Sequence, residues 1–257
     1  MKMTRKGFLQ LSGLSLIAIA AKKMGARKML RGAAGGSASE KREKTARWGM
    51  VIDLQKCRQK EGCNRCIKAC HSAHNVPQFA DRAHEVKWVW KQPFEEVFPF
   101  GQTQYTRELN AGLPVLLMCN HCDDPPCTDV CPVNATWRTD DGVVTIDFHR
   151  CIGCRYCMAA CPYGSRGFNW QDPRAAIPTV NSDFPTRSKG VVEKCNFCEE
   201  RLARKLAPLC VEACEEKALV FGDLEQPDSE IRKLLRSRFA VQRKPELGTG
   251  PSVYYLI

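Results

Sequence analysis

The chain has 257 residues, 44% of them hydrophobic, so it is long and apolar enough to fold around a core rather than remain disordered. Its net charge of +11 is concentrated at the N-terminus: residues 1–50 carry 12 lysines and arginines against two glutamates, whereas residues 51–257 carry 27 basic and 26 acidic residues. A body with so little net charge argues against a nucleic-acid-binding protein, which needs a basic face.

Residues 1–45 are expected to form an export signal followed by a flexible arm. Arg5 and Lys6 precede an apolar run, residues 11–21, that is too short to cross a hydrocarbon core of about 30 Å. Residues 4–10 resemble the twin-arginine (Tat) signal pattern, although Lys6 stands where a second arginine belongs. We therefore expect a peripheral protein at the periplasmic face of the cytoplasmic membrane. A basic amphipathic arm that lies on a membrane or partner is the alternative.

The body, residues 46–257, contains all 16 cysteines, and they fall into four groups of four. Their spacings are C-x5-C-x2-C-x3-C, C-x2-C-x4-C-x3-C, C-x2-C-x2-C-x3-C and C-x2-C-x11-C-x3-C. No cysteine is left over. The groups are Cys57, Cys63, Cys66 and Cys70; Cys119, Cys122, Cys127 and Cys131; Cys151, Cys154, Cys157 and Cys161; and Cys195, Cys198, Cys210 and Cys214.

The third group, with Pro162 directly after it, matches the spacing by which bacterial ferredoxins hold cubane iron–sulfur clusters. Zinc is the alternative for an isolated C-x2-C pair, but four complete groups favour clusters. Disulfides are the other alternative in an exported chain, although two cysteines three positions apart rarely reach unstrained bridging geometry. The spacing therefore predicts iron–sulfur chemistry.

The groups also form an internal repeat in the order A-B-A-B, and each follows a short strand-like run, at residues 48–54, 115–118, 143–147 and 191–193. The expected fold class is α+β, a nested double bacterial-ferredoxin-like domain that holds four cubane clusters, with loop insertions. Its inner half is expected at about residues 112–180 and its outer half at about 46–75 and 188–225. A C-terminal tail follows at residues 226–257.

In a two-cluster ferredoxin the fourth cysteine of each motif binds the other cluster. Proline follows the fourth cysteine only in the two central groups, so we pair the central groups with each other and the outer groups with each other. Pairing of each A group with the neighbouring B group remains an alternative. The predicted ligand sets are cluster 1, Cys151, Cys154, Cys157 and Cys131; cluster 2, Cys119, Cys122, Cys127 and Cys161; cluster 3, Cys57, Cys63, Cys66 and Cys214; and cluster 4, Cys195, Cys198, Cys210 and Cys70.

These quartets resemble the four-cluster ferredoxin subunits of the dimethyl sulfoxide, polysulfide, nitrite and tetrathionate reductase type, over the chain from about residue 48 to its end. Residues 57–63, 70–77, 147–164 and 248–256 look most like the DsrO type, the exported ferredoxin subunit of the membrane complex of dissimilatory sulfite reduction. The resemblance implies four [4Fe–4S] clusters, nested pairing and an electron relay in sulfate respiration. It also implies an integral membrane quinone-interacting partner (NrfD/PsrC-like) and a multihaem cytochrome c.

The residues themselves favour the same role. Sixteen thiolates saturate four clusters, so no iron is left open to bind a small-molecule substrate, and we expect an electron carrier with no catalytic site of its own. The alternatives are the iron–sulfur subunit of a molybdopterin oxidoreductase, an independent iron–sulfur enzyme, and a zinc- or disulfide-stabilised binding module. His71 and His121 lie beside cysteines, but complete quartets make them unnecessary as ligands.

Two further sets of residues could tune or extend this function. Basic residues near the quartets would raise cluster reduction potentials, and about half are expected to be ordinary solvated charges; Arg155→Gln, for example, should lower a potential. Aromatic residues between the first two groups are expected in the core, with a docking surface around Trp90 as the alternative. The basic residues are Arg58, Arg65, Lys68, Arg150, Arg155, Arg166, Lys194, Arg201 and Arg204; the aromatic ones are Trp88, Trp90, Phe94, Phe98, Phe100 and Tyr105.

Overall fold

A computed structural model describes residues 45–99 and 103–257. The predicted export signal and nearly all of the predicted arm, as well as Phe100, lie outside the described residues. Within the described residues, no helix has both the length and the apolar character needed to cross a bilayer.

A four-stranded sheet unites the start and the end of the described chain. Its order is β8-β1-β10-β9, with β1 antiparallel to β8 and parallel to β10. Met50, Val51 and Ile52 of β1 are fully buried, because both of its edges are paired and both of its faces are covered. The bounds are β1 (Trp48–Asp53), β8 (Leu219–Asp223), β9 (Ala240–Val241) and β10 (Val253–Leu256).

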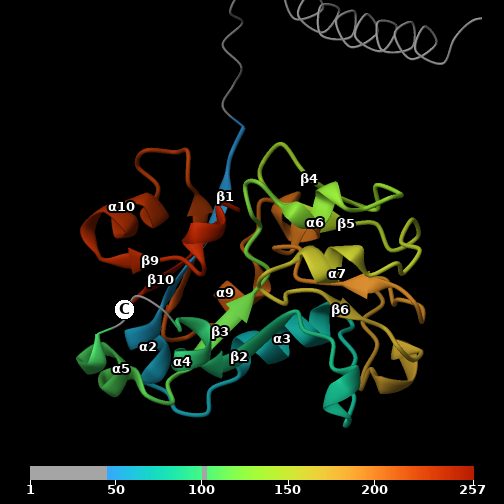
Figure 1. Ribbon diagram of the computed structural model, residues 1–257, viewed down its shortest axis with the longest axis horizontal. Helices are drawn as coiled ribbons and strands as arrows, with labels where there is room; N and C mark the ends of the chain where they lie inside the picture. Colours follow the sequence, from blue (N-terminus) through green and yellow to red (C-terminus); the bar gives the residue numbers. More distant parts are fainter. Residues whose placement is uncertain (1–44, 100–102) are drawn as a thin grey trace, which may run out of the picture. The chain divides into compact units, whose positions relative to one another are not determined.

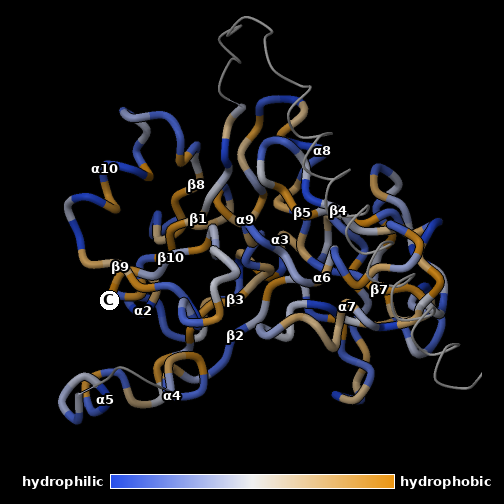
Figure 2. Tube along the Cα trace, turned by 45° about the horizontal axis from the view of Figure 1, so that its top comes forward, coloured by the Kyte–Doolittle hydropathy of each residue, from blue (hydrophilic) through white to orange (hydrophobic). Residues whose placement is uncertain are grey.

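Helix α10 (Glu230–Ser237) packs on this sheet through Ile231, which contacts Val51 and Leu256. Figure 2 shows the alternation of hydrophilic and hydrophobic positions along α10 that is typical of a helix with one buried face. The tail after residue 225 therefore completes the outer part of the fold.

The outer half also contains the short helices that carry or adjoin its cysteines. Asp53 caps α2 (Leu54–Arg58) by accepting hydrogen bonds from the backbone N–H groups of Gln55 and Lys56. Helix α3 (Arg65–Ala73) contacts α9 (Leu209–Glu212), and α8 (Glu199–Leu202) precedes α9 in the chain.

The inner half has smaller sheets. A hairpin joins β4 (Thr136–Arg138) to β5 (Val144–Ile146), and α6 (Pro126–Asp129) contacts α7 (Tyr156–Ala160). A second pair joins β6 (Gly167–Phe168) to β7 (Val192–Glu193). In Figure 1 these elements lie together on the side of the body opposite α10 and the four-stranded sheet.

The insertion between the first two cysteine groups forms an antiparallel pair of strands, β2 (Val89–Pro93) and β3 (Pro114–Met118). Two helices lie between them in sequence, α4 (Phe94–Val97) and α5 (Gln104–Asn110). Three short 3₁₀ segments complete the description: η1 (Arg82–His84), η2 (Pro173–Ala176) and η3 (Pro245–Leu247). The four strand-like runs expected before the cysteine groups correspond to β1, β3, β5 and β7, which gives the mixed α/β architecture expected from the sequence.

Candidate metal centres

The helices bring the cysteine groups together in two pairs. The first and fourth groups meet where α3, which carries Cys66 and Cys70, contacts α9, which carries Cys210. The second and third groups meet where α6, with Cys127, contacts α7, with Cys157. Each half of the fold is thus built from one A group and one B group.

Three cavities are each lined by four cysteines, three from one group and one from another. We call the cavity of Cys131, Cys151, Cys154 and Cys157 site 1. Site 2 is lined by Cys119, Cys122, Cys127 and Cys161. Site 3 is lined by Cys57, Cys63, Cys66 and Cys214.

Site 4 comprises Cys70, Cys195, Cys198 and Cys210, all of which are buried. Cys70 on α3 and Cys210 on α9 come together where the two helices make contact, and the charges of Cys195, Cys210 and Cys198, as well as that of Cys66 from site 3, act on Cys70. Burial, followed by these neighbouring charges, raises the pKa of Cys70 well above its ordinary value. All 16 cysteines of the chain are free thiols, and the four sites account for every one of them.

The local backbone repeats between the two halves. Gly62 before Cys63 and Gly153 before Cys154 both have left-handed φ angles, +69° and +70°, which a tight loop of thiolates requires. In the B groups, Cys131 accepts a hydrogen bond from Ala135 N at 3.2 Å and Cys214 accepts one from Ala218 N at 3.3 Å. The repeat seen in the sequence is therefore also a repeat of sulfur-directed N–H groups.

The donor chemistry fits iron–sulfur clusters. Burial raises the pKa of Cys195 to about 12 and that of Cys66 to about 11, so these thiols stay neutral until a cation displaces their protons. At site 2, both polar atoms of the Asn120 side chain and Nη1 of Arg166 are buried without a hydrogen-bond partner. Two of these atoms, Nδ2 of Asn120 and Nη1 of Arg166, are donors that would be available to the inorganic sulfides of a cluster.

His71 and His121 make hydrogen bonds that do not involve a metal. Nε2 of His71 bonds to the carbonyl of Val89, and Nδ1 of His121 accepts from the backbone N–H of Val144. His121 also stacks on Phe197 with ring centroids 3.6 Å apart. His121 and Phe197 hold equivalent positions in the two B groups, two residues after the first cysteine of each group. Their stack therefore joins the inner half of the fold to the outer half.

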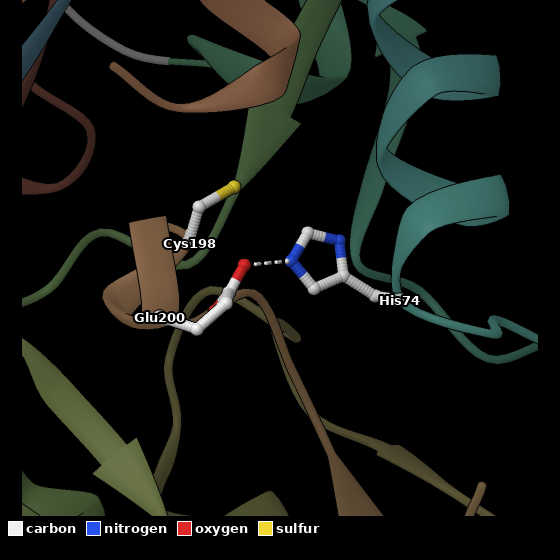
Figure 3. A group of neighbouring side chains, drawn as sticks. All are labelled: His74, Cys198 and Glu200. Carbon is white, nitrogen blue, oxygen red and sulfur yellow. Dashed lines mark hydrogen bonds and ion pairs between the residues drawn. The ribbon is translucent and has the colours of Figure 1, made fainter. Parts of the chain in front are cut away.

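His74 is a residue that the cysteine spacing did not single out. It lies at the C-terminal end of α3, and its Nε2 is 3.1 Å from Oε1 of Glu200. Figure 3 shows this pair with the side chain of Cys198 next to it. Burial acts to lower the pKa of His74, but hydrogen bonds with Cys198 and Glu200 outweigh it and raise the pKa to about 9. Because Cys198 belongs to site 4, we interpret His74 and Glu200 as neighbours of that site; the i+4 spacing of His74 from Cys70 was the available signal.

The C-terminal tail closes over site 2, which the sequence did not suggest. The backbone N–H groups of Asp123 and Asp124 donate to the carbonyls of Gly250 and Thr249. The Thr249 hydroxyl forms hydrogen bonds with Cys122 and, at 2.6 Å, with the Tyr163 hydroxyl. Residues from the end of the chain thus help to exclude water from an inner site.

Only two of the nine basic residues singled out from the sequence are buried, Arg166 and Lys194. Nη2 of Arg166 donates to Sγ of Cys127 at 2.9 Å. Arg155 is exposed, and its guanidinium lies over the Trp170 ring. More than half of these nine basic residues are therefore ordinary solvated charges, a larger share than we expected.

The aromatic insertion packs mainly into the core. Trp88, Phe94 and Phe98 are buried, and Trp90 is only 7% exposed, so the hypothesis of a docking surface around Trp90 is wrong for that residue. Tyr105 on α5 is 77% exposed.

Comparison with known proteins identifies the family. Residues 115–177 match a 4Fe–4S dicluster domain. The chain is 42% identical, over 85% of its length and 86% of the relative's, to iron–sulfur subunit 1 of an Hdr-like menaquinol oxidoreductase from Archaeoglobus fulgidus. The chain belongs to the family of iron–sulfur subunits of respiratory oxidoreductases. Members of this family carry electrons within a larger oxidoreductase, so the expected role of an electron-carrier subunit is confirmed.

Two other members show how widely the family is used. The iron–sulfur cluster-binding subunit of a menaquinone reductase from Nitratidesulfovibrio vulgaris is 37% identical over 82% of this chain and 88% of its own length. A tetrathionate reductase subunit from Salmonella typhimurium is 38% identical over 82% of this chain and 72% of its own length. The match to the 4Fe–4S dicluster domain and these relatives confirm the iron–sulfur binding and the ferredoxin-type fold that the cysteine spacing predicted.

Proposed function

We propose that this chain relays electrons through four [4Fe–4S] clusters held at sites 1–4. The observation that carries the proposal is the division of 16 cysteines into four sets of four, each of which combines three thiols of one motif with one thiol of another. Each set provides the four thiolates that a cubane requires. The nested ligand sets predicted from the sequence are the ones we assign to these sites.

A cluster that is fully held by thiolates accepts and returns single electrons without bonding to a substrate. The chain's residues do the remaining work. Buried side chains such as Phe197 and Tyr163 exclude water, backbone N–H groups point at the cysteine sulfurs, and buried cations compensate the negative charge.

On one side of the relay, electrons pass to or from an integral membrane quinone-interacting subunit of the NrfD/PsrC-like type. On the other side, they pass to or from a multihaem cytochrome c or a similar redox protein. Two relatives are named for menaquinol or menaquinone chemistry, which supports a quinone-linked complex. The Tat-like N-terminal residues support assembly at the periplasmic face of the membrane. The DsrO-like stretches support a place in sulfate respiration.

A second candidate is the iron–sulfur subunit of a molybdopterin oxidoreductase. The similarity to the tetrathionate reductase subunit favours it. The two candidates share the relay and differ in the neighbouring subunits. Purification of the native complex, with identification of the subunits that co-migrate with this chain, separates them.

Metal analysis of the purified holoprotein tests the relay itself. Four clusters require about 16 iron atoms and about 16 sulfides per chain. We also expect the isolated chain to turn over no substrate while it exchanges electrons with artificial dyes. Zinc in place of iron, an iron content of about eight, or turnover by the isolated chain would contradict the proposal.

A further inference from the structure

Site 2 is surrounded by buried positive charge that no carboxylate neutralises. Arg166, Lys194 and Arg243 are all buried, and none of them forms an ion pair with an acidic side chain among the described residues. A buried charge without a counter-ion is strongly unfavourable in a folded protein. The three cations therefore require an anionic group that belongs to the site itself.

Arg166 makes the most direct contact with site 2. Its Nη2 donates to Sγ of Cys127 and to Oγ1 of Thr136, both at 2.9 Å, while Nη1 remains buried and without a partner. The guanidinium thus contributes one charge-assisted bond to a cysteine sulfur and a second donor with no protein acceptor.

The other two cations come from different segments of the chain. Nζ of Lys194 bonds to the carbonyl oxygens of Val144, which lines site 2, and Cys195, which belongs to site 4. Arg243 comes from the C-terminal tail, lies over the Tyr163 ring at 5.4 Å, and has Nε and Nη1 without partners. Lys194 therefore lies between two sites, whereas Arg243 adds charge to site 2 alone.

Site 4 differs from site 2 in the charges that surround it, although its four cysteines are all buried. Beside Cys198 of this site lies His74, whose Nε2 contacts the carboxylate of Glu200 at 3.1 Å. At site 3 the exposed Lys60 and Arg65 are both paired with Glu215, and Lys91, which lines the site without an ion pair and donates to the carbonyl of Cys63, is only partly buried. None of these three cations donates to a cysteine sulfur in the way that the buried Arg166 does. A cluster becomes more negative on reduction, so unpaired cations in a low-dielectric environment stabilise its reduced form.

We infer that the cluster held at site 2 has the highest reduction potential of the four, and that Arg166 is the main residue that sets it. The inference rests on the proposed four-cluster relay. It makes site 2 the position where an electron resides longest between transfers, with site 4 as the low-potential neighbour across the His121–Phe197 stack.

The test compares Arg166→Gln, Arg166→Lys and Arg155→Gln by EPR-monitored redox titration of the holoprotein in its native complex. Arg166→Gln should shift the highest midpoint potential downward, with a smaller shift at site 1, because the charge of Arg166 also acts on Cys157 there. Arg166→Lys keeps the charge and should restore most of that potential. Arg155→Gln removes an exposed guanidinium near site 1 and should change the potentials little, because solvent screens it.

The outcomes are distinguishable. An iron content well below about 16 atoms per chain in the unmodified protein defeats the relay proposal. With all clusters present, an unchanged highest potential in Arg166→Gln overturns this inference, as does an equal shift in Arg166→Lys. If Arg166→Gln loses its clusters, Arg243→Gln decides: a lowered highest potential supports the inference, and an unchanged one overturns it.

Discussion

Arg187 and Glu193 form an ion pair in which both side chains are completely buried. Arg187 also donates to the backbone carbonyls of His74 and Asn75, at 2.6 and 2.8 Å, and Glu193 accepts from Nε1 of Trp88 at 2.9 Å. The pair therefore fixes the loop before the fourth cysteine group against the end of α3, where site 4 begins.

Glu193→Gln should lower the free energy of unfolding by about 3–5 kcal/mol, because it leaves the buried guanidinium of Arg187 without a counter-ion. The fall in the melting temperature of the holoprotein measures this loss. Asp172→Asn is the matched control, since it breaks the exposed Arg174–Asp172 pair and should cost at most about 1 kcal/mol. Equal effects of the two variants would show that burial of the pair is unimportant.

Gly153→Ala should remove the cluster at site 1. A Cβ at Gly153 would lie 2.2 Å from the carbonyl oxygen of Gly190, so the loop that carries Cys151 and Cys154 must move. Gly164→Ala meets the same left-handed φ strain, but no atom lies within 4 Å of its Cβ. We expect a loss of about four iron atoms per chain in the first variant and none in the second. Full iron content in Gly153→Ala would refute the prediction.

Trp90→Ala should destabilise the whole body by about 3–5 kcal/mol rather than weaken partner binding selectively, because the indole lies in the core. Tyr105→Ala removes an exposed ring and should change stability by less than about 0.5 kcal/mol. Thermal unfolding of both variants checks the difference. A stable Trp90→Ala variant that fails only in complex assembly would restore the docking hypothesis for that residue.

Double substitutions test the nested ligand sets. Cys57→Ala and Cys214→Ala each disable site 3, so the double variant should lose about four iron atoms, no more than either single variant. Cys214→Ala combined with Cys195→Ala disables sites 3 and 4 and should lose about eight. Pairing of each A group with the neighbouring B group places Cys57 and Cys214 in different clusters, so the Cys57–Cys214 double variant would then lose about eight iron atoms. The Cys195–Cys214 double variant loses about eight under either pairing and serves as the reference for the loss of two clusters.

The parts of the fold predicted from the sequence are those with local signals. Cysteine spacing predicted the sulfur loops, and short strand-like runs predicted β1, β3, β5 and β7, because both patterns depend on neighbouring residues. The parallel pairing of β1 with β10 joins segments about 200 residues apart and leaves no local trace. For the same reason, the closure of site 2 by Thr249 could not be predicted.

Charge was harder to predict than ligation. Of the basic residues near the cysteines, sequence proximity marked Arg155 and Arg166 equally, yet the structure places one guanidinium over an exposed ring and the other on a cysteine sulfur. Burial depends on how distant segments pack, and it decides whether a charge acts on a metal site or is screened by water. Arg243, far from every cysteine in sequence, became relevant only through the fold.

The cysteines of sites 1 and 2 all lie within residues 119–161, whereas those of sites 3 and 4 span residues 57–214. The ribosome therefore delivers every thiol of the inner pair while the outer pair is still incomplete. Strand β10 follows all four cysteine groups in the chain, so the sheet around β1 closes only after every thiol has been synthesised. The inner pair is therefore the first for which complete sets of four thiols exist during synthesis.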